Sequence, residues 1–331
     1  MTRRTRAVGY RGIADVDHFE VVEGVSVRGA TEKDVLLDPE TGHWYIAKLG
    51  GRHNDIEVGT EFAIYVVGRS LGVFVADARI ARYRGRVRFL SRYFLDRTAA
   101  EELVHGMQLF RELYDDDTVS NVLKDEQREQ DLFSIQAVKA AFGAHYIDYG
   151  PGVEEKLFGG FVAMLTHDAL LGVQDRHHEN WGVVVQRERG AQPPRFAPLY
   201  DSARGLFCNL TDELIRKSFH CSNGPNWLGH YVNRARPLVG CTGLTPTNDR
   251  RYVTHLELIA AVYDRYPEQR TIVRTIVESF DWRRVHAELR EELGVLFSPQ
   301  RLDLMRICLH KRQKAVLAAI DGQTSTADIL G

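Results

Sequence analysis

Two neighbouring stretches decide how this chain is interpreted: HDALLGVQDRHHENWGVVV at residues 167–185 and PRFAPLYDSARGLF at residues 194–207. Asp175 and Asn180 lie five residues apart in a polar loop, and Asp201 follows 26 residues after Asp175, behind an apolar, strand-like run. Phosphoryl transfer on a kinase fold needs this set, because one carboxylate receives the acceptor hydroxyl while an amide oxygen and a second carboxylate hold magnesium on the nucleotide phosphates. The stretch therefore predicts a phosphotransferase.

The polar residues can be given separate roles. Asp175 is the candidate base, and its main task is to orient the acceptor hydroxyl, because proton transfer matters late in a loose phosphoryl-transfer transition state. His177 can donate a hydrogen bond to the γ-phosphate as charge shifts. Asn180 and Asp201 offer a neutral and a charged oxygen, and hard oxygen ligands suit magnesium. ATP and Mg²⁺ are the cofactors that this set predicts.

The same loop also has a plainer interpretation. DRHHEN can be a solvated polar turn, since loops of this composition are common and a DxxxxN spacing often arises by chance. The buried helix before the loop and the strands after it favour the catalytic interpretation. Within the loop, Arg176 is expected to pair with a carboxylate and brace the backbone, and His178 is expected at the surface.

Lys48 stands mid-strand in YIAKLGG, between apolar neighbours. Burying its ammonium without a partner is costly, so a contact with nucleotide phosphates and a carboxylate partner on the following helix is expected. Glu57 and Glu61 are one helical turn apart and share a face. Glu61 leads directly into the apolar run FAIYVV and is the predicted partner. The alternative is a strand lysine that extends to solvent beside two surface glutamates.

A turn ahead of this strand completes the predicted nucleotide site. Gly29, Ala30 and Thr31 begin the sequence GATEKD, whose backbone N–H groups can cover the phosphates. An ordinary hairpin turn is the alternative, since the loop has neither a GxGxxG nor a Walker pattern. Thr31 is also a candidate for autophosphorylation, unless it only caps the turn. Arg92 and Tyr93, close to the lobe boundary, are assigned to nucleotide binding as well.

The remaining pattern predicts an α+β chain of two lobes. Residues 1–96 read as strands, turns and one helix, and form a β-rich N-lobe; residues 97–331 form a helical C-lobe. Residues 207–248 are rich in Gly, Pro and Asn and are expected to be irregular, a place where acceptor recognition would differ. Helices are expected in the C-lobe at 98–114, 125–143, 152–172, 249–264, 268–279, 281–292 and 298–319.

Composition excludes several other classes of protein. The 331 residues carry a net charge of −2, which gives no support to nucleic-acid binding by bulk electrostatics. No apolar run reaches membrane-spanning length, and the N-terminus lacks the apolar region of a signal peptide. The four cysteines form no CxxC pair. We therefore expect a cytoplasmic protein with reduced thiols.

At these residues the chain resembles the HipA-like kinases, bacterial relatives within the protein-kinase-like fold. The resemblance extends from about Gly24 to Leu317. The DRHxxN core is also similar to that of phosphatidylinositol kinases and actin-fragmin-type kinases. The matching segments are RGATEKDVLL for the phosphate-covering loop, WYIAKL for the lysine strand, TEFAIYVVGRSLGV for the helix with the paired glutamate, and GVQDRHHENWGV with FAPLYDSA for the catalytic and metal segments.

The resemblance implies ATP and magnesium binding and phosphorylation of Ser or Thr on a protein. By position it assigns the phosphate-binding lysine to Lys48, the catalytic aspartate to Asp175, and the metal ligands to Asn180 and Asp201. The chain departs from conventional protein kinases in having Ser-Ala, not Phe-Gly, after the metal aspartate. No antitoxin-binding subdomain is expected ahead of Gly24, and a regulatory protein partner stays open.

Fold and motif limit the chemistry without naming the acceptor. A lipid head group, a peptide natural product or another small molecule is the alternative to a protein. Two further alternatives are transfer of AMP from a reversed nucleotide and a non-catalytic, nucleotide-binding regulator. The presence of every expected polar residue argues against the last.

Overall fold

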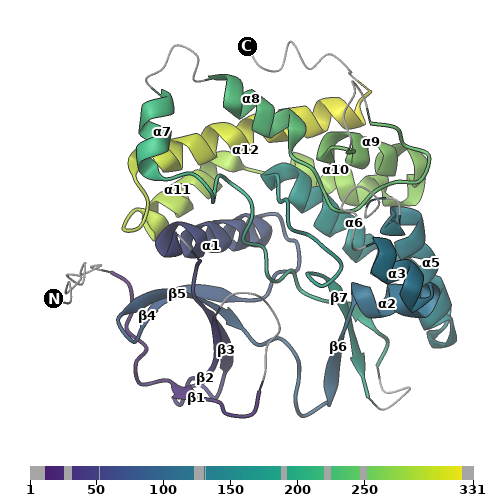
Figure 1. Ribbon diagram of the computed structural model, residues 1–331, viewed down its shortest axis with the longest axis horizontal. Coiled ribbons are helices and arrows are strands. Elements are labelled where there is room, and N and C mark those ends of the chain that lie inside the picture. Colours follow the sequence, from purple (N-terminus) through teal and green to yellow (C-terminus); the bar gives the residue numbers. More distant parts are fainter. Residues whose placement is uncertain are drawn as a thin grey trace.

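The structure is a computed structural model, and its N-terminal and C-terminal parts differ in character (Figure 1). Strands dominate the first part, and helices dominate the second. Gly29, Ala30 and Thr31 lie outside the described residues, so their predicted contact with phosphates stays a prediction. The structure describes residues 12–25, 32–51, 53–122, 130, 132–187, 192–219, 225–246 and 252–322.

The N-terminal part is a five-stranded antiparallel sheet in the order β1-β2-β3-β5-β4. Its outer hairpin turns at Arg84 and Gly85, which both have positive φ (49° and 74°), as a tight turn between right-handed twisted strands requires. The register aligns Lys33 of β2 with Lys48 of β3. The strands are β1 (Glu20–Val21), β2 (Lys33–Leu37), β3 (Trp44–Lys48), β4 (Ala78–Tyr83) and β5 (Arg86–Arg92).

Helix α1 (Asn54–Ser70) lies between this sheet and the helical part of the molecule (Figure 1). It packs on β4 and β5 on one side and on α11 (Trp282–Leu293) on the other. Gly59 lets α1 approach the segment after α11 closely, because a Cβ at this position would lie 2.5 Å from the ring of Phe297. The helix that carries Glu61 is therefore held by both parts of the chain.

A second sheet corrects one prediction. Residues 98–114 were expected to be helical, but Glu101–His105 form β6, and only Gly106–Leu113 form helix α2. β6 pairs antiparallel with β7 (Gly182–Gln186), which in turn pairs with β8 (Arg195–Phe196). The segment EELVH favours a helix locally, and pairing with the apolar strand β7 overrides that preference.

The predicted central helix is confirmed. Helix α6 (Val153–Leu171) is buried on nearly all sides, with Phe158, Phe161 and Leu170 fully covered. It ends at Gly172 in the left-handed conformation (φ 68°), the usual end signal of a helix. The chain passes from there directly into the Asp175 loop. Helices α3 (Asp116–Val122) and α5 (Ile135–Tyr146) and the short η1 (Ile147–Tyr149) come before it in the chain.

The C-terminal helices close the core around α6, which packs against α9, α10 and α12. The expectation that residues 207–248 are irregular is wrong in two places, because α7 and α8 form there and pack on α12. No helix among the described residues is long and apolar enough to cross a membrane. The elements are α7 (Asp212–Phe219), α8 (Pro225–Arg234), α9 (His255–Arg265), η2 (Pro267–Gln269), α10 (Arg270–Glu278), α11 and α12 (Pro299–Ile320).

Candidate active site

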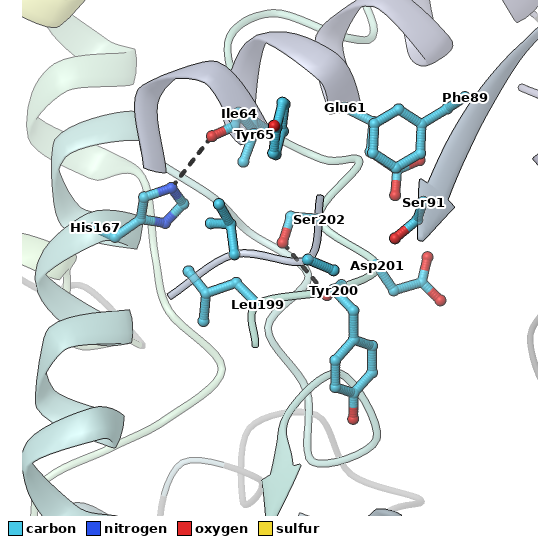
Figure 2. A pocket seen from close by; sticks show the side chains of 12 residues that line it. Glu61, Ile64, Tyr65, Phe89, Ser91, His167, Leu199, Tyr200, Asp201 and Ser202 are labelled. Atoms are coloured by element: carbon cyan, nitrogen blue, oxygen red, sulfur yellow. Dashed lines mark hydrogen bonds between the residues drawn. The ribbon is translucent and has the colours of Figure 1, made fainter. Parts of the chain in front are cut away.

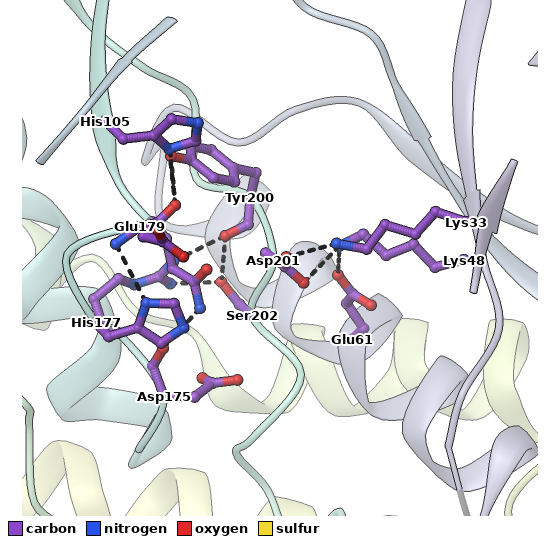
Figure 3. Close-up of polar contacts among 12 residues, drawn as sticks. Lys33, Lys48, Glu61, His105, Asp175, His177, Glu179, Tyr200, Asp201 and Ser202 are labelled. Atoms are coloured by element: carbon purple, nitrogen blue, oxygen red, sulfur yellow. Dashed lines mark hydrogen bonds and ion pairs between the residues drawn. The ribbon is translucent and has the colours of Figure 1, made fainter. Parts of the chain in front are cut away.

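Charged side chains from four segments meet between the N-terminal sheet and the helical part (Figure 3). Lys48 comes from β3 and Glu61 from α1, while Asp175 lies in the loop after α6. Asp201 follows β8 and its neighbouring bridge. The predicted residues are thus distant in sequence and gathered at one place.

The pairing predicted for Lys48 is confirmed. Its ammonium forms an ion pair with the Glu61 carboxylate, and both side chains are only 8% exposed. Burial by itself lowers the pKa of Lys48, but Glu61 and Asp201 together raise that pKa above its ordinary value, so the lysine stays charged. Glu57 has another task, because it accepts hydrogen bonds from the backbone N–H groups of Gly51 (2.6 Å) and His53 (3.2 Å) at the start of α1.

Asp201 is held by two lysines. Lys48 Nζ lies 3.1 Å from its Oδ1 and Lys33 Nζ 3.0 Å from its Oδ2. Burial raises the pKa of Asp201, but the two lysines outweigh burial and hold it well below its usual range. Asp201 also has a positive φ of 52°, an uncommon conformation for a non-glycine residue and one that is costly to hold. The carboxylate is therefore fixed in place by its partners and by its backbone.

Lys33 is a site residue that sequence reasoning missed. It was read as part of the turn GATEKD, yet it is the first residue of β2. Its register partner is Lys48, so both side chains project from the same face of the sheet. The sequence does show a second lysine beside the strand that precedes the lysine strand, but the register that places it opposite Lys48 comes only from the structure.

Asp175 lies in a different environment. Its Oδ2 accepts a hydrogen bond from the backbone N–H of Arg204 (3.2 Å), and its buried Oδ1 has no hydrogen-bond partner within the described part of the chain. Burial raises the pKa of Asp175 to about 6, against the lowering effect of Arg176. A carboxylate with one uncommitted oxygen can still accept a hydroxyl proton.

The expected brace of the loop is confirmed at Arg176. This fully buried guanidinium makes a two-point contact with Asp168, at 2.9 and 3.1 Å. It also donates to the carbonyls of Asn180 and Tyr200, both at 2.9 Å, and to the Ser202 hydroxyl. One arginine therefore connects α6, the Asp175 loop and the Asp201 segment.

The two histidines of the loop differ. Burial lowers the pKa of His177 below its ordinary value, so the ring is neutral at pH 7. Its Nδ1 accepts from the backbone N–H of Glu179 (3.2 Å), which leaves the proton on Nε2 as a donor. The expectation for His178 is wrong: its ring is half-buried 4.6 Å from that of Phe133, and burial lowers its pKa to about 3.

A second group missed in the sequence joins the Asp201 segment to the catalytic loop. The Tyr200 hydroxyl donates to the Glu179 carbonyl (3.1 Å) and lies 2.9 Å from Nδ1 of His105. His105 is the last residue of β6, which lies in the stretch that was predicted to be helical. The two loops are thus joined at Tyr200 as well as at Arg176.

Arg92 and Tyr93 lie at the end of β5, where the chain leaves the N-terminal sheet. The backbone N–H of Tyr93 donates to the carbonyl of Trp44 (2.8 Å), and the two rings are 6.0 Å apart. Neither side chain forms a hydrogen bond or ion pair with the lysine–carboxylate cluster in the described part of the chain. Their assignment to nucleotide binding stays a prediction.

Comparison with known protein families shows to which family this chain belongs. The HipA-like C-terminal domain matches residues 25–236, which include every candidate site residue described above. The chain belongs to the HipA-like family of kinases.

Two solved structures share the fold of this HipA-like chain. The Helicobacter pylori proinflammatory kinase CtkA is 19% identical, with a TM-score of 0.70, over 93% of this chain and 99% of the other. HipA from Shewanella oneidensis MR-1, crystallised with HipB and its operator DNA, is 13% identical, with a TM-score of 0.55, over 90% of this chain and 66% of the other. The predicted kinase-like α+β fold is thereby confirmed. No curated protein matches this sequence.

The oxygens of the HipA-like site fit a magnesium ion. Asn180 donates through its amide nitrogen to the Asp175 carbonyl (2.8 Å), so its amide oxygen is the atom left for a metal. The Asp201 carboxylate is 30% exposed, and each oxygen holds one lysine with lone pairs to spare. Amide and carboxylate oxygens are the donors that Mg²⁺ takes, usually one or two from the protein with the rest from phosphates and water.

A small cavity lies against α1, with Glu61 and Asp201 in its lining (Figure 2). Its volume of about 20 Å³ is enough for roughly one water molecule. Polar groups of Glu61, Ser91, His167 and Ser202 line it. The cavity is too small for a nucleotide.

Proposed function

We propose that this HipA-like chain is an ATP- and magnesium-dependent kinase that phosphorylates serine or threonine on a protein. The observation that carries the proposal is the ion-pair cluster of Lys33, Lys48, Glu61 and Asp201 beside the Asp175 loop. Cations for phosphates, oxygens for a metal and a carboxylate for the acceptor are the parts that phosphoryl transfer requires.

The nucleotide side of the mechanism follows from the two lysines. Glu61 keeps Lys48 charged and aimed from the sheet toward Asp201, where triphosphate oxygens would take its remaining donors. Lys33 reaches the same place from the neighbouring strand. A magnesium ion on Asn180 and Asp201 would neutralise charge on the phosphates during transfer. The chain itself contributes a preorganised set of charges that need not rearrange during the reaction.

The acceptor side depends on Asp175. Its free Oδ1 can accept the hydroxyl proton of a serine or threonine and orient that oxygen toward the γ-phosphate. With a pKa of about 6, the carboxylate is ionised at pH 7 yet closer to the operating pH than an ordinary aspartate, as a general base should be. The neutral His177, protonated on Nε2, is placed in the same loop to donate to the transferring group.

The proposal that the acceptor is a protein rests on the similarity of this chain to known proteins. The family match and the likeness to CtkA and HipA support a kinase, and HipA was crystallised with a protein partner, HipB. A regulatory protein partner for this chain is proposed on the same ground.

The test is mass spectrometry of the purified chain, incubated with ATP and magnesium alone, with a mixture of serine- and threonine-containing proteins, and with a mixture of lipids and small molecules that carry hydroxyl groups. The expected result is a gain of phosphate on a hydroxyl side chain that disappears in the Asp201→Ala variant. A gain of AMP, phosphate found only on added lipids or small molecules, or no transfer by the folded wild type would each contradict the proposal. Circular dichroism of both preparations shows that the variant is folded.

A further inference from the structure

Helix α8 carries a side chain that touches both active-site loops. The hydroxyl of Tyr231 lies 2.9 Å from the carbonyl oxygen of Leu171 and 3.0 Å from that of Gly172, where α6 ends and the Asp175 loop begins. The same hydroxyl accepts a hydrogen bond of 2.7 Å from the backbone N–H of Leu206, five residues after Asp201. One oxygen thus joins the entry of the first loop to the segment that follows the metal aspartate.

We propose that Tyr231 is a positioning residue that holds the segment after Asp201 against the entry of the Asp175 loop. Because it concerns the rate of transfer, the proposal rests on the kinase function proposed above. Tyr231 lies within residues 207–248, which were predicted to be irregular and to differ with the acceptor. The proposal gives one residue of this stretch a role in positioning the site.

The two segments run side by side beyond Tyr231. The backbone N–H of Gln174 donates to the carbonyl of Arg204 (2.9 Å), and the backbone N–H of Arg204 donates to Oδ2 of Asp175 (3.2 Å). Three contacts therefore follow one another along the two segments: Tyr231 with Leu206, Gln174 with Arg204, and Arg204 with the Asp175 carboxylate. A shift of Leu206 would be passed on to the donor that fixes the orientation of Asp175.

The backbone of the downstream segment needs such support. Leu206 and Phe207 have φ values of 42° and 67°, a left-handed conformation that side chains other than glycine seldom adopt and that costs free energy at each residue. Such a conformation persists only where surrounding contacts fix it. The Tyr231 hydroxyl holds the N–H of Leu206, and the Tyr231 ring lies 4.5 Å from that of Phe207.

Tyr231 is itself fixed relative to the end of α6. The buried Arg312 of α12 donates to the carbonyl of Ala169 in the last turn of α6 (2.7 Å) and to the carbonyls of Tyr231 and Val232 (3.0 and 2.9 Å). Gly172 leaves room for the tyrosine, since a Cβ there would lie 2.9 Å from the hydroxyl. The end of α6 and the backbone of Tyr231 are thus both held by Arg312 of α12.

Tyr231→Phe tests the proposal, because it removes one oxygen and keeps the ring. Steady-state kinetics should show kcat lowered by about 10- to 100-fold, the effect of a small misplacement of reacting groups, with KM for ATP changed by less than about threefold. Amide hydrogen exchange of a peptide covering residues 202–207 should be faster than in the wild type. Tyr146→Phe is the matched control, since Tyr146 is a buried tyrosine of α5 outside the site; it should change neither measurement.

Exchange at residues 202–207 that equals the wild-type rate would overturn the proposal. So would faster exchange with wild-type kcat, or a loss that falls on KM for ATP alone. The two measurements also separate this inference from the proposed function. An inactive wild type would contradict the kinase assignment, while exchange in the variant would still decide whether Tyr231 holds the two segments together.

Discussion

Asp168 and Asp175 lie at the two ends of the segment that leads from α6 into the catalytic loop, and their carboxylates are treated in opposite ways. Asp168 is fully buried and faces Arg176 at two points and His167 at a third, and these partners outweigh burial to hold its pKa well below the usual range. Asp175 has one backbone donor and one oxygen without a partner within the described part of the chain, and its pKa rises to about 6.

The difference teaches how two carboxylates of one segment acquire different roles. A buried carboxylate whose two oxygens are both held by close partners stabilises the structure and is not available to a substrate. A carboxylate with a buried oxygen that lacks a donor is unfavourable for the folded state, and that free oxygen is what the role proposed for Asp175 requires. Removing the first should damage stability, and removing the second should damage only the reaction.

The largest effect is expected for Asp175→Asn on transfer. The asparagine keeps the shape but loses the charge that accepts the proton and orients the hydroxyl, so transfer should fall by at least about 10³-fold. Lys48, Asn180 and Asp201, the residues proposed to hold the nucleotide and its metal, are unchanged, so the Kd for ATP should change by less than about tenfold, or 1.4 kcal/mol. Calorimetric titration and a phosphate-transfer assay on one preparation measure both quantities.

Either half of that prediction can fail on its own. Retained transfer would mean that another group, such as His177, orients the acceptor. Lost ATP binding would place Asp175 among the metal ligands and remove the contrast with Asp168 as stated.

Arg176→Met should give the second largest effect, on stability. It leaves the Asp168 carboxylate buried without its main partner, and breaking a buried pair in this way costs about 3 to 5 kcal/mol of unfolding free energy. Urea unfolding of the variant measures the loss. Arg204→Met is the matched control, because Arg204 lies in the neighbouring segment with an exposed side chain, and its replacement should cost less than about 0.5 kcal/mol. Equal losses in the two variants would show that Arg176 is not the brace.

The sequence predicted the residues of this comparison unequally. Asp175, Asn180 and Asp201 were found because their spacing lies within two short stretches, and Lys48 with Glu61 because a strand lysine needs a carboxylate on the next helix. Lys33 was missed, since its place opposite Lys48 depends on a strand register that no local pattern gives. The functional roles of all these residues remain proposals.

Two of the three parts of the fold that were predicted wrongly share one physical cause. β6 was expected to be helical because EELVH favours a helix, and it becomes a strand by pairing with β7. α8, and Tyr231 with it, was missed because its sequence contains Gly, Pro and Asn, although it packs as a helix on α12. In these two cases contacts distant in sequence overrode local preference. α7 is different, because DELIRKSF favours a helix by itself and was missed only because the surrounding stretch is rich in Gly, Pro and Asn. α6, apolar on nearly every side, showed its burial in its own residues.

Asp175→Asn should also stabilise the folded protein at neutral pH, in contrast to Arg176→Met. The folded state holds the Asp175 proton with a pKa of about 6 against an ordinary 3.8, so above pH 6 ionisation favours unfolding. Removing that charge should raise the unfolding free energy by about 1 to 3 kcal/mol at pH 7. The gain should shrink as pH falls from about 6 to 4, because the wild type then binds the proton in its folded state. Urea unfolding at pH 7, 6, 5 and 4 measures the difference in unfolding free energy between Asp175→Asn and the wild type. A difference that does not change with pH would contradict the raised pKa of Asp175.

The smallest effect is expected for Lys33→Met, and it sharpens the contrast between the ion pairs of the site and the structural pair of Arg176 and Asp168. Lys33 faces the Asp201 carboxylate at 3.0 Å, and its removal also removes the cost of burying its ammonium. Asp201 is 30% exposed and keeps Lys48, so no buried charge is left unpaired and stability should change by less than about 1 kcal/mol. The nucleotide would lose one charged donor to its phosphates, which should weaken ATP binding by about tenfold, or 1.4 kcal/mol. Titration with ATP and urea unfolding of Lys33→Met separate the two effects. Lys139→Met is the control, because Lys139 of α5 forms an ion pair with Glu268 outside the site. A variant that unfolds as readily as Arg176→Met would place Lys33 with the structural ion pairs, and one that binds ATP as the wild type does would remove it from the nucleotide site.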